Sequence, residues 1–553
     1  MKFKSRDFSN SKIVLDVRDL CVRLPNQPKL PPILDGVSLQ IRAGETACLV
    51  GESGSGKSVT SLAVMGLLPK DALRVTGGSI TLSGRNLLQL SQKEMRESRA
   101  RNMAMIFQEP MTALNPVMRV GAQIEEVLKV HEEMPQRERQ RRVYDILEQV
   151  HLPDVRRIYA SYPHQLSGGQ RQRIMIAMAL ILEPELLIAD EPTTALDVTT
   201  QGQILKLIAE LQEKQDTAVL FITHDMGVVA EIADSVHVMK DGKVVEQAPV
   251  ERLLRSPRED YTRRLLQAVP SLLPRQLRPR KGGEPVLQVR ELKKVYGEGG
   301  FFRRSQGMLA AEDVSFEIPR GRTLGIVGES GSGKSTVARC VMRLIDPTAG
   351  QIMVAGNEIA RLSRQALRPY RRHIQIVFQD PFRSLNPRWK VGRSLVEGPV
   401  NYGTPRQEAM KQAGDLMELV GLPRDALDRY PHQFSGGQRQ RIAIARAVAM
   451  KPDVLVADEA VSALDVSIQA QVLELLADIQ EKLGVAILFI THDLRVAAQI
   501  CDDILVMQKG RVVEYGTASE VLANPSHPYT RALTEAAPGR GWDFANFREL
   551  RVA

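Results

Sequence analysis

The chain repeats its own motifs in one order, and this duplication constrains the fold more than any other feature of the sequence. The segment GESGSGKS occurs at Gly51–Ser58 and again at Gly328–Ser335. Three further pairs follow in the same order: SGGQRQRI at 167–174 and 435–442, ADE at 189–191 and 457–459, and FITHD at 221–225 and 489–493. Because self-similarity at a long period marks repeated structural units, we expect two domains of one architecture.

The boundaries of these units follow from composition. Residues 270–285, PSLLPRQLRPRKGGEP, are rich in proline and basic residues and have little apolar periodicity, which is typical of a linker. The sequence after Asn524 is again punctuated by proline and glycine. We therefore predict a polar N-terminal tail at 1–12, a first domain at 13–262, a linker at 263–285, a second domain at 286–523 and a C-terminal extension at 524–553.

The order of predicted elements indicates an α/β fold. Short apolar runs at Glu45–Val50 and Thr323–Val327 are typical of buried strands, and each leads through a glycine-rich loop into a helical pattern. Strands that alternate with helices predict a parallel or mixed sheet with helices on its faces. The openings of the two units, 14–24 and 286–296, alternate more like antiparallel strands.

Composition excludes several classes of protein. Hydrophobic residues make up 43% of the 553 residues and charged residues 25%, as in globular proteins. No apolar run approaches the roughly 18–20 residues of a membrane span, and the polar N-terminus does not resemble a signal peptide. We expect the chain to stay on the side of the membrane where it is made.

The charge and the cysteines point to no special chemistry. The four cysteines lack zinc-ribbon spacing, so we expect small buried residues in a reducing compartment and no zinc. The net charge of +9 favours a solvated basic surface, with a membrane-surface location as the second interpretation. Aromatic residues make up only 5% of the chain, so few rings are available on which the bases of a single-stranded nucleic acid could stack.

GESGSGKS fits the phosphate-binding pattern G-x-x-x-x-G-K-[ST], twice. Its glycines let backbone N–H groups surround phosphate oxygens, its lysine reaches the β- and γ-phosphates, and its serine can bind Mg²⁺. A plain glycine-rich turn would not recur between a strand and a helix in both units. The predicted nucleotide-binding residues are Gly51, Glu52, Ser53, Gly54, Ser55, Gly56, Lys57, Ser58 and Val59, with Gly328, Glu329, Ser330, Gly331, Ser332, Gly333, Lys334, Ser335 and Thr336.

An Asp-Glu pair ends a buried strand in each unit. Asp190 and Asp458 stand where a Mg²⁺ ligand belongs at a strand's carboxyl end. The next residues, Glu191 and Glu459, point to the other side, so we assign them to polarising the attacking water, the alternative being a simple helix cap.

His224 and His492 follow the next buried strand in each unit. A lone histidine is usually structural. Because these two recur at the same distance from the Asp-Glu pair, we expect them to position the γ-phosphate or the water.

The SGGQ segments open predicted helices. Ser167 and Ser435 are suitable N-caps, and the glycines after them leave the first N–H groups of the helix uncovered, which makes an anion site without a lysine. An ordinary capped helix is the alternative. The predicted residues of this second phosphate surface are Ser167, Gly168, Gly169 and Gln170, with Ser435, Gly436, Gly437 and Gln438.

Together these motifs resemble the ATP-binding-cassette family. The glycine loops match Walker A, Phe107–Pro110 and Phe378–Pro381 match the Q-loop, SGGQ matches the signature, and Ala195–Asp197 and Ala463–Asp465 match the D-loop. The segments at 109–121 and 380–392 and the HPYT element at 527–530 are similar to the dipeptide, oligopeptide and nickel import ATPases, whose fused members include glutathione and microcin-type peptide importers. Asp260-Tyr261-Thr262 resembles a degraded first copy of HPYT.

The resemblance implies two ATP sites, each formed by Walker A of one cassette and the signature of the other, in two RecA-like cassettes with an antiparallel β subdomain and a helical signature subdomain. It implies catalytic roles for Gln108, Glu191, His224, Gln379, Glu459 and His492. It implies Mg²⁺ ligation by Ser58, Gln108 and Asp190 in one site and by Ser335, Gln379 and Asp458 in the other. No iron–sulfur cluster is expected, since 255–281 contain no cysteine.

The implied activity is ATP hydrolysis that powers peptide import. The implied partners are two transmembrane permease subunits and a solute-binding protein, with no nucleic acid, and the implied place is the cytoplasmic face of the inner membrane, held there through the permease. The alternative is a soluble tandem ATPase acting on ribosomes or DNA. The short proline-rich linker and the lack of zinc cysteine clusters favour the importer.

The two sites differ in the residue expected beneath adenine. The resemblance places Tyr296 there in the second cassette and Leu24 in the first. Since stacking on an aromatic ring is worth roughly 1–3 kcal/mol, we expect weaker nucleotide binding at the first site. Lys334→Ala, which spares the first site, should therefore bind ATP more weakly than Lys57→Ala. Equilibrium titration with a fluorescent ATP analogue measures this, and equal affinities would contradict it.

Overall fold

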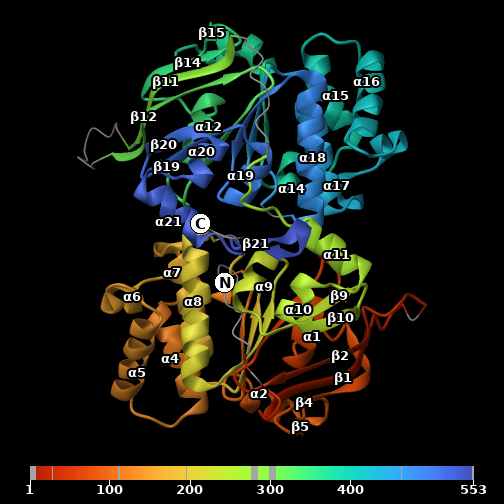
Figure 1. Cartoon of the computed structure of the whole chain (residues 1–553), viewed down its shortest axis with the longest axis vertical. Coiled ribbons are helices and arrows are strands. Elements are labelled where there is room, and N and C mark those ends of the chain that lie inside the picture. The colour runs from red at the N-terminus through yellow and green to blue at the C-terminus, as the bar shows by residue number, and fades with distance from the viewer. Residues whose placement is uncertain are drawn as a thin grey trace. The chain divides into compact units, whose positions relative to one another are not determined.

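The computed structural model describes residues 6, 8–27, 29–109, 113–194, 196–275, 284–297, 307–462 and 464–550, without the side chains of 382 and 383. These form two compact units, coloured along the chain in Figure 1. The first comprises Met1–Leu196, Thr200–Val269 and Gly541–Ala553, and the second comprises Asp197–Thr199 and Pro270–Arg540. Each unit is described by itself.

The first unit contains two sheets. A four-stranded antiparallel sheet has the order β2-β1-β4-β5, with β1 (Ile13–Arg23), β2 (Leu34–Arg42), β4 (Arg74–Leu82) and β5 (Arg85–Asn86). A six-stranded sheet has the order β10-β9-β3-β8-β7-β6, with β3 (Thr46–Val50), β6 (Met103–Ile106), β7 (Leu186–Asp190), β8 (Ala218–Ile222), β9 (Ser235–Lys240) and β10 (Lys243–Pro249). Only the edge strand β10 pairs antiparallel in the second sheet.

Helices surround these sheets. They are α1 (Lys57–Val64), α2 (Gln92–Ser98), α4 (Val120–His131), α5 (Gln136–Gln149), α6 (Val155–Ala160), α7 (Gly168–Leu180), α8 (Val198–Gln215), α9 (Met226–Ile232), α10 (Val250–Arg255) and α11 (Asp260–Gln267), with short 3-10 turns η1 (Leu87–Gln89) and η2 (Pro163–Gln165). The group α4 to α7 forms a helical subdomain inserted between β6 and β7 (Figure 1).

The second unit repeats this plan. Its antiparallel sheet has the order β12-β11-β14-β15, with β11 (Pro285–Tyr296), β12 (Met308–Pro319), β14 (Ala349–Val354) and β15 (Asn357–Glu358). Its mixed sheet has the order β16-β17-β18-β13-β19-β20, with β13 (Thr323–Val327), β16 (Ile374–Val377), β17 (Val454–Asp458), β18 (Ala486–Ile490), β19 (Asp503–Gln508) and β20 (Arg511–Thr517).

The helices of the second unit follow the same order. They are α12 (Lys334–Val341), α13 (Arg364–Leu367), α14 (Pro381–Ser384), α15 (Val391–Asn401), α16 (Arg406–Leu419), α17 (Gly436–Val448), α18 (Val466–Leu483), α19 (Leu494–Ile500), α20 (Ala518–Ala523) and α21 (Pro528–Ala536), with 3-10 turns η3 (Arg368–Arg372), η4 (Arg424–Asp428) and η5 (Pro431–Gln433). The predicted α/β class, the mixed sheet and the antiparallel opening strands are thereby confirmed in both units.

Each mixed sheet places its phosphate-loop strand in the interior. All five residues of β3 are buried, and β3 pairs in parallel with β8 on one side and β9 on the other. A strand buried on both faces is predominantly apolar, as TACLV is apart from Thr46. The carboxyl ends of β3, β6, β7 and β8 therefore meet at one edge of the sheet, where the functional loops begin.

The expected linker is partly packed. Its first residues continue α11 to Gln267 in the first unit, whereas Arg275 packs on the second unit, where its guanidinium lies 2.7 Å from Oδ1 of the buried Asp502. Residues 276–283 lie outside the described residues. Leucines and an arginine interleave the prolines of this segment, and each can pack or pair where a proline-rich composition alone suggests neither.

The C-terminal extension also divides. Residues through Arg540 belong to the second unit, whereas the segment from Gly541 packs on the first. There β21 (Trp542–Asp543) pairs with β22 (Arg548–Glu549), and η6 (Phe544–Asn546) contacts α11. Trp542 is 1% exposed, and the Arg255 guanidinium lies 5.4 Å from its ring centroid. Arg255 also forms a 3.0 Å ion pair with Glu549.

Among the residues that the structure describes, no helix combines the length and the apolar character that crossing a bilayer requires.

Trp542 should make a large contribution to the stability of the first unit. Trp542→Ala should cost about 3–5 kcal/mol, because it removes a fully buried aromatic side chain. In chemical denaturation followed by circular dichroism, the first unit should unfold at a lower denaturant concentration than in the unmodified chain. Trp389→Ala, which truncates the half-buried second tryptophan, is the matched control, and equal shifts in both variants would contradict the prediction.

Candidate phosphate-binding and hydrolytic sites

Glycine conformation shapes both phosphate loops. Gly51 and Gly328 have φ values of 150° and 149°, and a Cβ at either would lie 2.2 or 2.3 Å from the carbonyl oxygen of Met239 or Met507. Gly56 and Gly333, with φ of 105° and 104°, cap the following helices. Only glycine meets both demands, so the loop geometry is fixed by sequence.

The two loop lysines are held in the same way. Lys57 Nζ donates to the carbonyl oxygens of Gly51 and Glu52 at 2.8 and 2.9 Å. Lys334 Nζ donates to those of Gly328 and Glu329, both at 2.7 Å. Burial lowers the pKa of Lys334, against the opposing effect of nearby carboxylates. Each ammonium is thus oriented inside its loop, where it can meet a phosphate oxygen.

A serine and an aspartate face each other beside each loop. Ser58 Oγ lies 3.3 Å from Asp190 Oδ1, and Ser335 Oγ lies 3.3 Å from Asp458 Oδ1. Burial raises the pKa of Asp190 to about 6, and it also raises the pKa of Asp458. A hydroxyl beside a desolvated carboxylate is a set of hard oxygen donors that fits Mg²⁺, and a cation there would favour the ionised carboxylate.

The neighbouring glutamate points into a different cluster. Glu191 Oε2 accepts from Gln108 Nε2 at 2.9 Å and from the Thr194 hydroxyl at 2.9 Å. Glu191 Oε1 lies 3.1 Å from His224 Nδ1. In the second unit Glu459 accepts from Gln379 at 2.8 Å and lies 3.6 Å from His492 Nδ1. The structure therefore brings the predicted Gln, Glu and His together in each unit.

The backbone and the pKa of this glutamate are both unusual. Glu191 and Glu459 have φ of 46° and 48°, a left-handed conformation that is costly for a residue with a side chain. Burial acts most strongly on the pKa of Glu191 and raises it, but His224 and the other partners bring the net pKa below its ordinary value. The neighbouring His492 imidazole is the largest influence on the pKa of Glu459 and lowers it. The carboxylates are thus ionised and able to accept a proton.

The signature segments have the expected local geometry. Ser167 and Ser435 cap α7 and α17, and each side chain accepts from the backbone N–H three residues on, which confirms both predicted N-caps. Gly168 and Gly436 are exposed, and a Cβ at either would meet nothing within 4 Å. The helix ends are therefore open to an anion.

Two tyrosines that the sequence reasoning did not assign to the site contact the phosphate loops. Tyr261 Oη accepts from the Glu52 N–H at 3.2 Å, and Tyr529 Oη accepts from the Glu329 N–H at 3.1 Å. Both belong to the Tyr-Thr elements after each cassette. Their recurrence at matching positions was the available signal, but the contact depends on α11 and α21 folding back onto the loops.

Four residues of the predicted motifs are not placed at the sites described above, three of them because they lie outside the described residues. Tyr296 is half-buried at the end of β11, with Lys294 Nζ 5.2 Å from its ring centroid. Its expected role beneath adenine stays a prediction. Pro110 of the first Q-loop and Ala195 and Ala463 of the D-loops lie outside the described residues.

A glycine loop at the end of a central parallel strand, a buried lysine, a Ser-Asp pair and an adjacent Gln-Glu-His cluster define a P-loop nucleoside triphosphatase, present twice. Comparison with known proteins specifies it further. The ABC transporter family matches residues 34–194 and 311–462, and the oligopeptide/dipeptide transporter C-terminal region matches 245–304 and 513–544. The chain therefore belongs to the ABC transporter family, and it is an ATP-binding ATPase.

Full-length relatives agree with this assignment. The glutathione import ATP-binding protein GsiA of Salmonella choleraesuis strain SC-B67 is 46% identical, over 96% of this chain and 90% of its own. GsiA of Escherichia coli O157:H7 is 46% identical over 95% of this chain and 89% of its own.

Among solved structures, cbiO1 of Clostridium perfringens, part of the ABC transporter complex cbiONQ, is 32% identical over 44% of this chain and 92% of its own, with a TM-score of 0.38.

Removing the tyrosine hydroxyls should disturb nucleotide binding more than chemistry. In Tyr261→Phe and Tyr529→Phe, one loop N–H loses its acceptor, a cost of about 1 kcal/mol. We expect KM for ATP to rise about three- to fivefold with kcat nearly unchanged, in steady-state assays. Tyr370→Phe, which removes a hydroxyl from η3, is the control. A fall in kcat at constant KM would contradict a loop-positioning role.

Proposed function

We propose that this chain hydrolyses ATP with Mg²⁺ at two sites and thereby drives import of a peptide through membrane permease subunits. The observation that carries the proposal is the repeated Gln-Glu-His cluster beside an intact lysine loop and Ser-Asp pair. The match to the oligopeptide/dipeptide transporter C-terminal region and the naming of the relatives as import proteins support the transport role.

Each cassette contains the groups that the reaction needs. Ser58, Asp190 and the amide of Gln108 would hold Mg²⁺, which supplies charge neutralisation for the phosphates when bound. Lys57 would bind the β- and γ-phosphates. Glu191 would orient the attacking water and accept its proton, and His224 would hold the glutamate and contact the γ-phosphate. Ser335, Asp458, Gln379, Lys334, Glu459 and His492 would take the same roles in the second cassette.

The signature helices would complete these sites when ATP is bound. We propose that Ser435 to Gln438 contribute to the site built on Lys57, and Ser167 to Gln170 to the site built on Lys334. The open helix N-termini at Gly168 and Gly436 support this role, since they offer N–H groups to an anion. Covalent fusion would favour this pairing by raising the effective concentration of the two cassettes.

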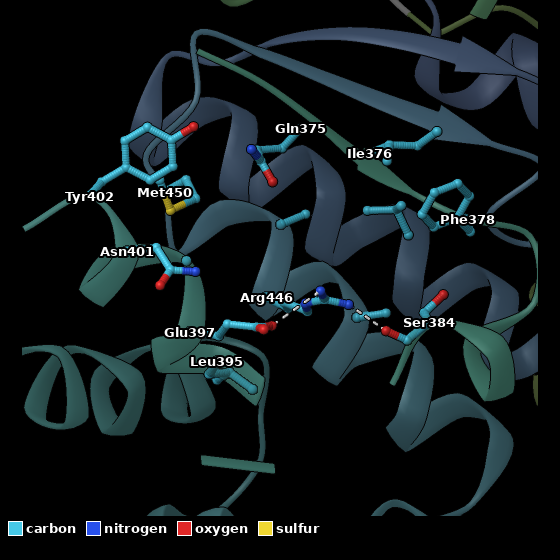
Figure 2. Close-up of a pocket in the computed structure, with 14 residues that line it drawn as sticks. Gln375, Ile376, Phe378, Ser384, Leu395, Glu397, Asn401, Tyr402, Arg446 and Met450 are labelled. Atoms are coloured by element: carbon cyan, nitrogen blue, oxygen red, sulfur yellow. Dashed lines mark hydrogen bonds and ion pairs between the residues drawn. The ribbon is translucent and has the colours of Figure 1, made fainter. Parts of the chain in front are cut away.

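A pocket of about 220 Å³ beside the second Q-loop is a suitable seat for a permease segment (Figure 2). It is bounded by β16, which leads into Gln379, and by α15 and α17 of the helical subdomain. Arg446 lies 3.8 Å from Glu397 and also donates to the Ser384 carbonyl oxygen, so one side chain links three elements around the pocket. A permease segment bound in this pocket would be displaced when Gln379 moves relative to the helical subdomain.

The cargo proposed is a short peptide or a glutathione-like compound. This follows from the names of the relatives and the C-terminal family match. A solute-binding protein would deliver the cargo, two permease subunits would carry it, and the chain would lie at the cytoplasmic face of the inner membrane. Recovery of two multi-span permeases with the tagged chain tests the partnership, and peptide uptake in membrane vesicles tests the cargo.

The pocket offers a sharper version of the partnership test. Tyr402, 37% exposed, lines it, and Tyr515, 47% exposed, lies on β20 and serves as a matched control. Tyr402→Ala should reduce permease recovery, whereas Tyr515→Ala should not. Equal recovery would reject the pocket as the seat.

Both glutamates should be needed for full turnover. Glu191→Gln and Glu459→Gln should each reduce ATP hydrolysis by half or more, and the double variant should lose about 10²–10⁴-fold, because the water loses its proton acceptor. Phosphate release assays measure this, with the exposed Glu481→Gln as control. A single variant with unchanged turnover would contradict the proposal of two active sites.

A further inference from the structure

The helical subdomain of the second cassette contains a basic pocket that the ATPase sites do not use. Its volume is about 490 Å³, and it lies between the loop before α15, the start of α16 and the turn η4. Five cationic side chains line it, with one carboxylate, Asp428. The cations are Arg388, Lys390, Arg393, Arg406 and Arg424.

Most of this positive charge is not neutralised within the protein. Lys390 lies 3.0 Å from Asp428, and Arg424 pairs with Asp415 and Glu418 at 2.5 and 2.6 Å. Arg388, Arg393 and Arg406 form no ion pair with any residue in the described parts of the chain. Like charges held together repel, so an anion bound among them would relieve that repulsion.

Aromatic rings orient part of this charge. The Arg393 guanidinium lies 3.9 Å from the centroid of the half-buried Trp389 ring, a close stacking contact, and the exposed Tyr430 lines the same pocket. Stacking on a ring leaves the N–H groups at the guanidinium edge available to an oxyanion. Arginine forks match phosphate oxygens in geometry as well as in charge.

The first cassette lacks four of these groups at the matching positions, whereas Arg119 and Tyr162 keep the cation of Lys390 and the ring of Tyr430. Val117, Met118 and Ala122 replace Arg388, Trp389 and Arg393, and Gln136 replaces Arg406. The Tyr159 ring also lies against Gly121, where a Cβ would come within 2.2 Å of it, whereas the Leu427 backbone and side chain border the corresponding Gly392. The cassette architecture therefore does not require these four side chains, which are specific to the second half.

We propose that this pocket binds a phosphate-bearing anionic ligand, held by Arg388, Arg393 and Arg406 against Trp389. Its volume lies in the range of small-ligand sites, and its lining combines aromatic surface with convergent cations. A phosphate of an anionic lipid headgroup and a soluble phosphate compound share this chemistry. The proposal stands apart from the import function, since it uses no residue of the hydrolytic sites.

The test compares two full-length double variants. Arg388→Val with Arg393→Ala installs the residues of the first cassette, and Arg137→Gln with Arg141→Gln removes the same charge from the exposed face of α5. Binding is measured with ADP and Mg²⁺ saturating the phosphate loops. One arm uses phosphatidylglycerol vesicles against phosphatidylcholine vesicles in flotation, and the other uses inorganic pyrophosphate in calorimetry.

We expect the pocket variant to lose about tenfold or more in affinity for one probe while the α5 variant changes less than twofold, with basal ATP hydrolysis unchanged in both. A loss confined to phosphatidylglycerol identifies a lipid headgroup, and a loss for pyrophosphate identifies a soluble ligand. Equal effects of the two variants on both probes, or no binding of either probe by the unmodified chain, would overturn the proposal. If the pocket variant does not fold, Arg388→Gln with Arg406→Gln replaces it, because both side chains are exposed.

Discussion

The hydrolytic sites depend on a buried strand that ends in a loop only glycine can form. Because β3 and β13 are enclosed on both faces and both edges, their carboxyl ends cannot move without disturbing the whole mixed sheet. The carbonyl oxygens of Met239 and Met507 leave no room for a Cβ at the first loop glycine. The loop therefore closes around its own lysine, and two carbonyl oxygens orient the ammonium.

The same sheet edge separates two carboxylates that are adjacent in the chain. Asp190 faces the loop serine, whereas Glu191 turns through a left-handed backbone conformation toward Gln108 and His224. The aspartate is desolvated and the glutamate is held ionised by its partners, so two neighbouring carboxyls have opposite pKa shifts. The two carboxyls therefore lie in different environments although they are adjacent in the chain. The second cassette keeps the arrangement, with a longer Glu459–His492 separation.

The two cassettes have matching residues at this edge of the sheet and differ in residues away from it. The second cassette has the basic pocket with Trp389, and its buried Asp502 pairs with Arg275 of the linker. The first cassette alone carries the segment that ends the chain, with Trp542 buried against it. The residues at the carboxyl edge of the mixed sheet are thus the same in both halves. The basic pocket and the C-terminal segment each belong to one half.

The sequence by itself determined the two-cassette plan, the phosphate loops, the Asp-Glu pairs and the N-capped signature helices. Each of these is local: a glycine pattern, a strand end or a capping residue fixes its own conformation through nearby backbone sterics and hydrogen bonds. Only the tertiary structure decided that Tyr261 and Tyr529 support the loops, that Arg275 pairs with Asp502, and that Trp542 packs on the first cassette. These contacts join segments far apart in the chain, and no local pattern specifies which buried polar group or apolar surface a distant side chain will meet.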